Sequence, residues 1–142
     1  MYKNFVKLFL RLAIAAGFLS AVADRFGMWD EKVSVWGNWD NFVGYTAMIN
    51  PWFPAAVIPV LAIVATLAEI VFAFFLIIGF KTELFAKLSG YLMLIFGLSM
   101  TFASGIKGAF DYSVFAAAGG AFALSLIREK FLEVDSLISG RK

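Results

Sequence analysis

The sequence predicts an all-α integral membrane protein, a four-helix bundle with a tryptophan-rich interfacial loop or short helix between its first and second spans. Hydrophobic residues make up 62% of the 142 residues and charged residues only 15%, whereas soluble domains are about 45 to 50% apolar. Four segments also approach the roughly 20 apolar residues that a helix needs to cross a bilayer. The chain is therefore expected to form one membrane domain, 1–142, with spans near 5–23, 57–79, 84–106 and 109–127.

The first span, 5–23, has a second interpretation. Lys3 and Lys7 precede a short apolar stretch that ends in the A-x-A pattern of residues 21–23, as in a cleaved secretory signal. Against cleavage, Arg11 interrupts the apolar stretch. Small residues also recur at the spacing typical of packed membrane helices. We therefore favour a retained helix.

The connection 24–56 contains all four tryptophans, whose amphipathic rings prefer the headgroup level of a membrane. Apolar residues at helical spacing between Trp39 and Ile49, followed by Asn50 and Pro51, predict a short interfacial helix and a rigid turn into the second span. Two roles fit this connection. It is either an aromatic anchor, which we favour, or a lid over a site that opens to the outer leaflet.

Glu69, near the middle of the second span, is the clearest functional pointer in the sequence. A charged side chain at bilayer depth costs about 2.5 to 3.5 kcal/mol on insertion scales, and it usually faces a bundle interior, a counter-charge or a water-filled cavity. Ala65 and Ala73 lie one turn to either side, so Glu69 should point inward. Arg11 in the first span either snorkels to the headgroups or turns inward to pair with Glu69.

Two further groups of charges lie at the outer ends of the spans. Asp24 and Arg25 end the first span, while Lys107 and Asp111 bracket the connection between the third and fourth. Bridges between Arg25 and Asp111 and between Asp24 and Lys107 are therefore expected. Such pairs more often anchor a helix at the interface than bind a ligand. Asp111 also suits the N-cap of the fourth span.

Four spans place both termini on one side of the membrane, and that side carries most of the basic residues. Nine of the twelve lie there: Lys3, Lys7, Arg11, Lys81, Lys87, Arg128, Lys130, Arg141 and Lys142. The positive-inside rule then makes both termini cytoplasmic. The tail, 128–142, has apolar residues set among charges, which predicts an amphipathic helix on the inner leaflet or, as the alternative, a docking surface for a partner.

Composition excludes several classes of site. The chain has no Cys and no His, which removes disulfides, thiol nucleophiles, Fe–S ligation and the commonest metal ligand. No metal, haem or Fe–S cluster is therefore expected. A net charge of +2 from scattered residues gives no support for nucleic-acid binding.

Over most of its length the chain resembles the DoxX family of small four-span bacterial membrane proteins, which includes the DoxD-like small subunit of thiosulfate:quinone oxidoreductase. The resemblance is carried by Leu10-Arg11-Leu12, Asp24-Arg25, Ala68-Glu69, Gly79-Phe80-Lys81-Thr82, Ala86 and Asp111-Tyr112-Ser113. One departure is clear. The family often has a glycine shortly after the glutamate of the second span, where this chain has Phe72, Ala73, Phe74 and Phe75.

The resemblance implies a protein of the bacterial cytoplasmic membrane, sometimes tied to quinone-linked sulfur oxidation or to oxidative-stress complexes. We expect a redox-associated subunit that holds a quinone or similar lipophilic ligand near Glu69. In this hypothesis Glu69 exchanges a proton with the ring oxygen, Arg11 stabilises its charge, and the ring contacts a set of aromatic side chains. These are Phe72, Phe75 and Tyr91.

Membrane lipid, a redox partner subunit and a second copy of the chain are the expected partners. Two other classes of function remain open. One is a small-solute or ion translocator with Glu69 and Arg11 in its polar pathway. The other is a non-catalytic scaffold that docks a partner through the tryptophan-rich outer face or the tail. Whether the chain is an enzyme stays undecided at this level.

Overall fold

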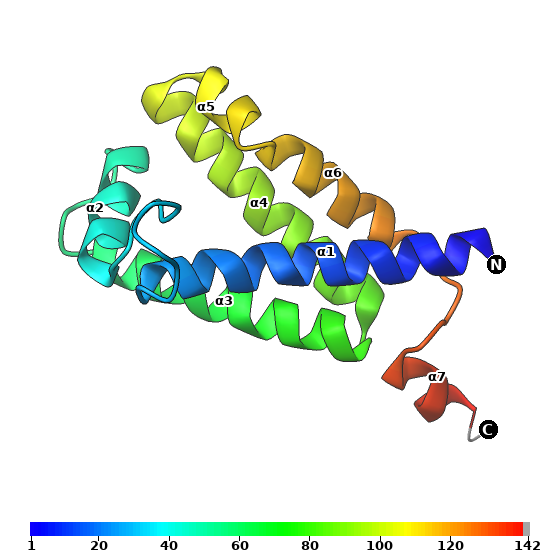
Figure 1. Ribbon diagram of the computed structural model, residues 1–142. Coiled ribbons are helices and arrows are strands. Elements are labelled where there is room, and N and C mark those ends of the chain that lie inside the picture. Colours follow the sequence, from blue (N-terminus) through cyan, green and yellow to red (C-terminus); the bar gives the residue numbers. More distant parts are fainter. Residues whose placement is uncertain (141–142) are drawn as a thin grey trace.

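The computed structural model of the chain describes residues 1–140, apart from the side chain of Ser139, and within them it contains helices and no strands. The all-α prediction is confirmed. The helices are α1 (Tyr2–Arg25), α2 (Trp39–Ile49), α3 (Ile58–Ile78), α4 (Thr82–Ser104), α5 (Ile106–Asp111), α6 (Val114–Ser125) and α7 (Val134–Ser139) (Figure 1).

Three of these helices, α1, α3 and α4, are long and apolar enough to cross a membrane. The segment expected to form one further span, 109–127, is divided instead. Gly105, at φ +95°, ends α4, and Ser113, at φ +55°, separates α5 from α6. The 12 residues of α6 extend over only about 18 Å, which is shorter than the ~30 Å of a bilayer's hydrocarbon core. Asp111 lies at the end of α5 and does not cap α6.

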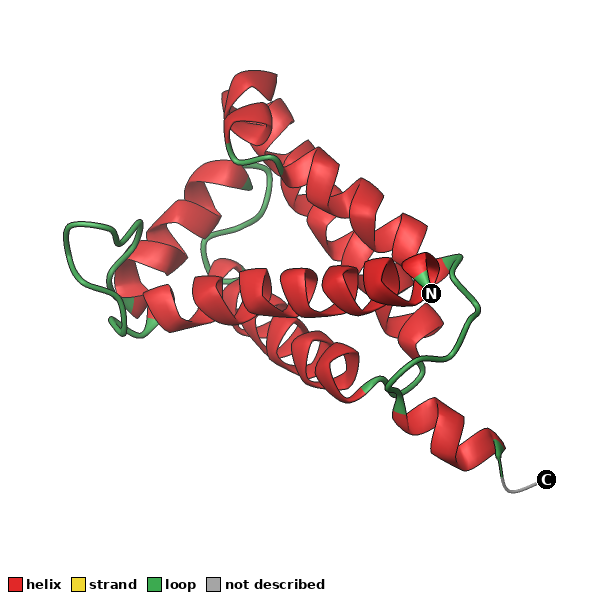
Figure 2. Ribbon diagram, turned by 45° about the vertical axis from the view of Figure 1, so that its right-hand side comes forward, coloured by secondary structure: helices red, strands yellow, loops and turns green. Residues whose placement is uncertain are grey.

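The long helices form two pairs, α1 with α3 and α4 with α6 (Figure 1). The pairs meet where α1 begins and α3 turns into α4, which we call the narrow end. They diverge toward the opposite, wide end, where α2 lies between them (Figure 2). At the wide end a second, smaller buried cluster of Ile49, Met100 and Ala109 packs α2 against α4 and α5.

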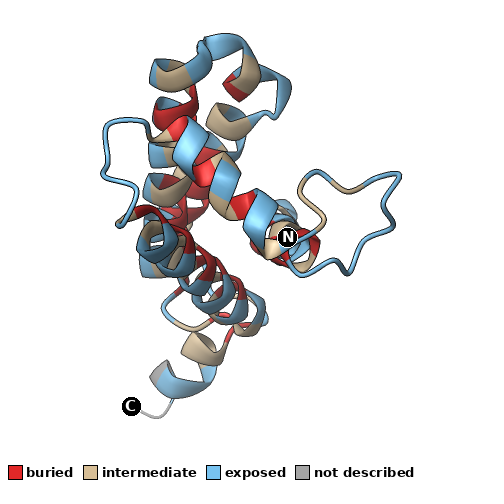
Figure 3. Ribbon diagram, turned by 90° about the vertical axis from the view of Figure 1, so that its left-hand side faces the viewer, coloured by how far each residue is buried: buried red, intermediate tan, exposed pale blue. Residues whose placement is uncertain are grey.

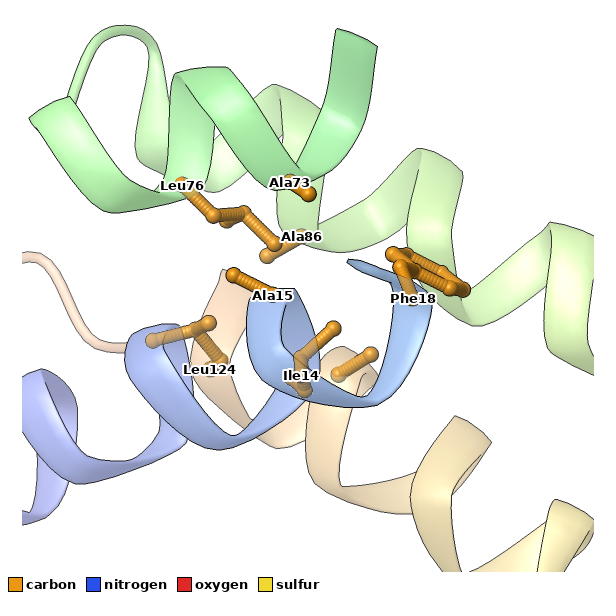
Figure 4. Close-up of a cluster of buried hydrophobic side chains, with 8 residues drawn as sticks. Ile14, Ala15, Phe18, Ala73, Leu76, Ala86 and Leu124 are labelled. Carbon is orange, nitrogen blue, oxygen red and sulfur yellow. The ribbon is translucent and has the colours of Figure 1, made fainter. Parts of the chain in front are cut away.

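The core fills the narrow end. There alanines from α1, α3, α4 and α6 let the backbones approach closely, and a few large side chains fill the remaining space (Figure 4). This cluster consists of Ile14, Ala15, Phe18, Ala73, Leu76, Ala86, Ala121 and Leu124. Along α4, glycines serve the same purpose, because a Cβ on Gly90 or Gly97 would lie under 3 Å from the rings of Phe122 and Phe115 on α6.

Large apolar side chains cover the outer faces of the long helices, while buried residues face inward (Figure 3). Leu67 on α3 and Phe102 on α4, for example, are 56% and 76% exposed. A soluble protein rarely leaves continuous apolar surface of this kind in water. Together with the three candidate spans, this surface indicates a helical membrane protein.

The tail departs from the predicted amphipathic helix 128–142. Within the described part of the tail, 128–140, only the six residues of α7 are helical, and the residues before them have no regular secondary structure. The side chain of Glu133 is buried in the protein interior, and Leu132 just before it has φ +48°, which is not a helical conformation. Arg141 and Lys142, which contribute to the predicted orientation, lie outside the described residues.

Candidate functional site

Glu69 is buried, 2% exposed, and its partner is Arg25 at the end of α1. The Nη2 atom of Arg25 lies 2.9 Å from Oε1 and 2.7 Å from Oε2 of Glu69, while Nη1 donates to Thr66 Oγ1 at 2.7 Å. Thr66 and Glu69 are three residues apart on α3 and therefore share a face. The prediction that Glu69 points inward is confirmed. The prediction that it pairs with Arg11 is wrong.

Two aromatic rings lie next to the Arg25 guanidinium. Its central carbon lies 3.8 Å from the ring centroid of Phe42 on α2 and 5.4 Å from that of Trp36 in the preceding loop. Cations are attracted to the faces of such rings, most strongly where water is excluded. Arg25 is thus held between a carboxylate from α3 and two rings from the connection that follows α1.

An apolar cavity of about 830 Å³ begins at Arg25 and occupies the wide end of the wedge. Its walls come from α1, α2, α3, α4, the loop before α2 and the start of α6. Known small-molecule sites measure about 300 to 1,000 Å³ and are mostly apolar with a few placed polar groups. Arg25 is one of the lining residues; Glu69 lies behind it and does not line the cavity.

A second polar group of side chains lies where α2 approaches α4. Ser99 donates to Asn50 Oδ1 at 3.1 Å, and Asn50 in turn donates to the carbonyl of Thr46 at 3.0 Å. Burial, together with the neighbouring Tyr112, raises the pKa of the Tyr45 phenol, so this phenol stays protonated and can donate a hydrogen bond. All five residues line the cavity.

Asp24 positions the loop that covers the cavity. Its buried carboxylate accepts hydrogen bonds from the hydroxyl of Ser34 and from the backbone N–H groups of Val35 and Trp36, the latter two at 2.9 and 3.0 Å. These bonds fix Trp36 beside Arg25. The bridge expected between Asp24 and Lys107 is therefore not formed.

Lys107 and Asp111 pair with each other instead. Their side chains meet at 2.6 Å across one turn of α5 and are largely exposed. Arg25 and Asp24 are buried with other partners, so neither expected bridge to α5 exists. An exposed pair of this kind contributes little to stability.

Arg11 is fully buried at the narrow end and does not snorkel. Its Nε and Nη2 atoms donate to the carbonyls of Leu76 and Ile77 at the end of α3, both at 2.8 Å. Its Nη1 atom donates to the carbonyls of Phe131 and Leu132 in the tail, both at 3.0 Å. The guanidinium therefore donates hydrogen bonds to carbonyls that have no partner within α3, because a helix leaves its last carbonyls free. The same guanidinium also binds the tail, so it joins the tail to the end of α3.

Lys7, Arg11 and Glu133 form a buried ionic cluster, which we call the tail latch. Glu133 Oε1 lies 2.8 Å from Lys7 Nζ and 3.6 Å from Arg11 Nη1. Gly79 ends α3 in the left-handed conformation and lies against this cluster, because a Cβ there would be 2.6 Å from the Cγ of Glu133. The carboxylate of Asp135 then accepts from the backbone N–H of Lys81 at 2.9 Å, next to the start of α4.

The aromatic residues proposed to contact a ligand lie elsewhere. Phe72 and Phe75 pack on Phe85, with ring centroids 5.9 and 4.4 Å apart, on the narrow-end side of Glu69. Tyr91 is 52% exposed and packs edge-on against Phe122 of α6. None of the three predicted residues lines the cavity.

From the sequence, Arg25 is among the polar candidates but is paired with Asp111, because it follows the first span and looks interfacial. The sequence does not identify Trp36 or Phe42 as site residues. Thr66, one turn before Glu69 on the same face, was the available signal that a donor approaches α3 at this level. Within residues 1–140, no group of three acidic side chains is placed to hold a metal ion.

Comparisons of the chain with protein-family models, with curated proteins and with solved structures find no match. The functional argument therefore depends on the cavity and on the ion pair beside it.

Proposed function

We propose that the chain is a DoxX-like, four-pass protein of the bacterial cytoplasmic membrane, and that it serves as a redox-associated subunit holding a quinone or similar small lipophilic molecule. The observation that carries the proposal is the apolar cavity of about 830 Å³ that begins at the Arg25–Glu69 pair. Its size and apolar walls suit a ring with an alkyl chain. Membrane lipid and a redox partner subunit complete the proposed setting.

The charges beside the cavity favour a neutral ligand. Glu69 compensates the charge of Arg25 at 2.7 Å, so the pair as a whole carries no net charge. Arg25 separates Glu69 from the cavity, and a guanidinium does not give up its proton in proteins. In this proposal Arg25 donates a hydrogen bond to the ligand, and Glu69 balances its charge. The proposal thus differs from the sequence-based hypothesis, in which Glu69 exchanges a proton with the ligand directly.

A cavity-filling substitution tests ligand binding. Ala65 lines the cavity on α3, whereas Leu67 on the same helix is exposed and does not line it. Native mass spectrometry of protein extracted in mild detergent should detect a ligand of quinone mass on the unmodified chain and on Leu67→Trp, and should lose it in Ala65→Trp. Ordinary phospholipid alone on all three proteins would refute the proposal.

The proposed orientation places the narrow end in the cytoplasm and makes α6 part of a fourth crossing. Because α6 is short, the proposal requires local thinning of the bilayer at this crossing. Basic residues are concentrated near the narrow end, as the positive-inside rule expects for a cytoplasmic side.

Single introduced cysteines test this topology. Because the chain has no cysteine of its own, only the introduced residue is labelled. Lys32→Cys and Lys107→Cys should react with a membrane-impermeant maleimide in intact spheroplasts. Arg128→Cys should react only after the membrane is permeabilised. If residues 107 and 128 react from the same side, α6 does not cross and the four-pass proposal is wrong.

A further inference from the structure

The cavity reaches the outer surface of the protein between α3 and α4. Val64 on α3 and Ile95 on α4 both line it, and their side chains are 59% and 58% exposed. Each belongs to an exposed row of its helix. Leu67, three residues after Val64, is exposed and does not line the cavity, and the same is true of Leu98, three residues after Ile95. The wall of the cavity therefore continues into the outer surface at Val64 and Ile95.

Both residues point away from the helices that pack against the other side of α3 and α4. Thr66, two residues after Val64, faces α1, because it accepts a hydrogen bond from the end of α1. Gly97, two residues after Ile95, faces α6, because a ring of α6 packs against it. Side chains two residues apart lie on nearly opposite sides of a helix, since each residue turns it by about 100°. The opening therefore lies on the face of the molecule away from α1 and α6.

The opening lies well inside the two helices. α3 begins at Ile58 and α4 ends at Ser104. At about 1.5 Å per residue, Val64 lies roughly 9 Å and Ile95 roughly 14 Å along their helices from these ends. Each half of a bilayer's hydrocarbon core is about 15 Å thick, and both helices are long and apolar enough to cross a membrane. In a membrane that α3 and α4 cross, acyl chains therefore surround the opening.

The α1 side of the cavity is covered differently. Trp29 lines the cavity there, and its Nε1 atom donates to the carbonyl of Ser20 at 3.1 Å, which holds the ring against α1. The charged side chains of Asp24 and Arg25 belong to the same wall. A hydrocarbon chain passes more easily along the apolar rim between α3 and α4, because burying a charged group against such a chain is costly.

We propose that the opening between Val64 and Ile95 is a lateral portal, through which the ligand enters the cavity from the lipid and in which its hydrocarbon chain remains. The head of the ligand occupies the cavity, and the rest of the chain lies in the bilayer. The class of ligand is therefore a membrane-dissolved molecule with a long chain, including chains too large for the cavity of about 830 Å³. This inference depends on the proposed function, since it states how the ligand of the same cavity arrives.

Chain length tests the portal on the unmodified chain. The two probes are 2-decyl-1,4-benzoquinone and a 1,4-benzoquinone with a decaprenyl chain, which is too large to fit wholly inside the cavity. Native mass spectrometry in mild detergent measures their competition. We expect the decaprenyl compound to displace the decyl compound, because its chain leaves through the portal. If the decyl compound binds and the decaprenyl compound does not displace it, the inference is overturned and the proposed function stands. If neither binds, the proposed function fails as well.

Exchange rates locate the portal. Protein loaded with the decylbenzoquinone is mixed with an excess of empty micelles, and native mass spectrometry follows the loss of ligand. Val64→Phe with Ile95→Phe places two rings at the opening. Ile63→Phe with Leu98→Phe is the matched control, because both residues are exposed on the same helices and do not line the cavity. Gly17→Phe obstructs the α1 side, where an added Cβ has no neighbour within 4 Å.

We expect Val64→Phe with Ile95→Phe to lose the ligand about tenfold more slowly than the unmodified chain, which corresponds to about 1.4 kcal/mol of added barrier. The control pair and Gly17→Phe should exchange at the unmodified rate. If the portal pair exchanges as fast as its control, or if only Gly17→Phe slows exchange, the ligand does not pass between α3 and α4 and the inference is overturned. The competition measurement needs no variant, so it decides the case if a substituted protein fails to fold.

Discussion

Replacing Glu69 by Ala is expected to lower the free energy of unfolding by about 3 to 5 kcal/mol, because it leaves a buried guanidinium without its counter-charge. Arg25 and Glu69 are each about 2% exposed and meet at 2.7 Å, so water cannot replace the lost carboxylate. Unfolding by SDS titration in mixed micelles, followed by helical circular dichroism, measures the loss. Glu83→Ala removes an exposed carboxylate from α4 and serves as the control.

Removing both charges should restore most of this stability. Replacing a buried ion pair by apolar residues of similar volume is often neutral or stabilising. Thr66 also donates to the carbonyl of Ala62 at 2.8 Å, so it keeps a partner when Arg25 is absent. The double variant Arg25→Met with Glu69→Leu should therefore have a free energy of unfolding close to that of the unmodified chain. If the free energy of unfolding of Glu69→Ala lies within about 1 kcal/mol of that of the unmodified chain, removing Glu69 does not leave Arg25 as an uncompensated buried charge.

Arg11→Ala is expected to release the tail and to destabilise the narrow end by about 3 kcal/mol or more, since it breaks a buried charged network. The substitution removes four hydrogen bonds to backbone carbonyls, two at the end of α3 and two in the tail. Limited trypsin digestion should then cleave after Arg128 and Lys130 much faster than in the unmodified chain. SDS titration gives the change in stability.

Lys3→Ala provides the matched control for the tail latch. Lys3 also bridges to the tail, at 3.1 Å from Glu129, but its side chain is 77% exposed. Water screens an exposed pair of this kind, so it contributes little to stability and this variant should leave tail cleavage nearly unchanged. Equal cleavage rates in Arg11→Ala and Lys3→Ala would show that Arg11 does not hold the tail.

Periodicity and composition predicted the three long apolar helices and the inward direction of Glu69, because both depend on local spacing. They could not predict the partner of Glu69. If neighbouring helices begin and end at the same levels, Arg11 inside the first span is the basic residue expected to reach Glu69, whereas Arg25 at the end of that span is not. In the structure the end of α1 lies close enough to the middle of α3 for Arg25 to reach Glu69. The axial offset between two helices is set by tertiary packing, and the spacing of residues along one helix does not show it.

The tail and the cavity were unpredictable for related reasons. Phe131, Val134, Leu137 and Ile138 have the spacing of an amphipathic helix. In the structure, however, Glu133 pairs with Lys7 and Arg11, and the residues before it are not helical. The cavity is lined by residues from separate helices and from a loop. Spacing along one helix shows which residues face inward, and it does not show whether the space between helices is filled.

The arrangement of the two arginines of α1 has a mechanical consequence. Arg11 and Arg25 join α1 to α3 at two levels, so these helices resist sliding and tilting relative to each other. Phenylalanine rings seated on Gly90 and Gly97 join α4 to α6 in the same way. The two pairs share mainly the alanine-rich core at one end and α2 at the other. We therefore expect the angle between the pairs to change more easily than the packing within either pair, so that lateral pressure in a membrane would act first on the volume of the cavity.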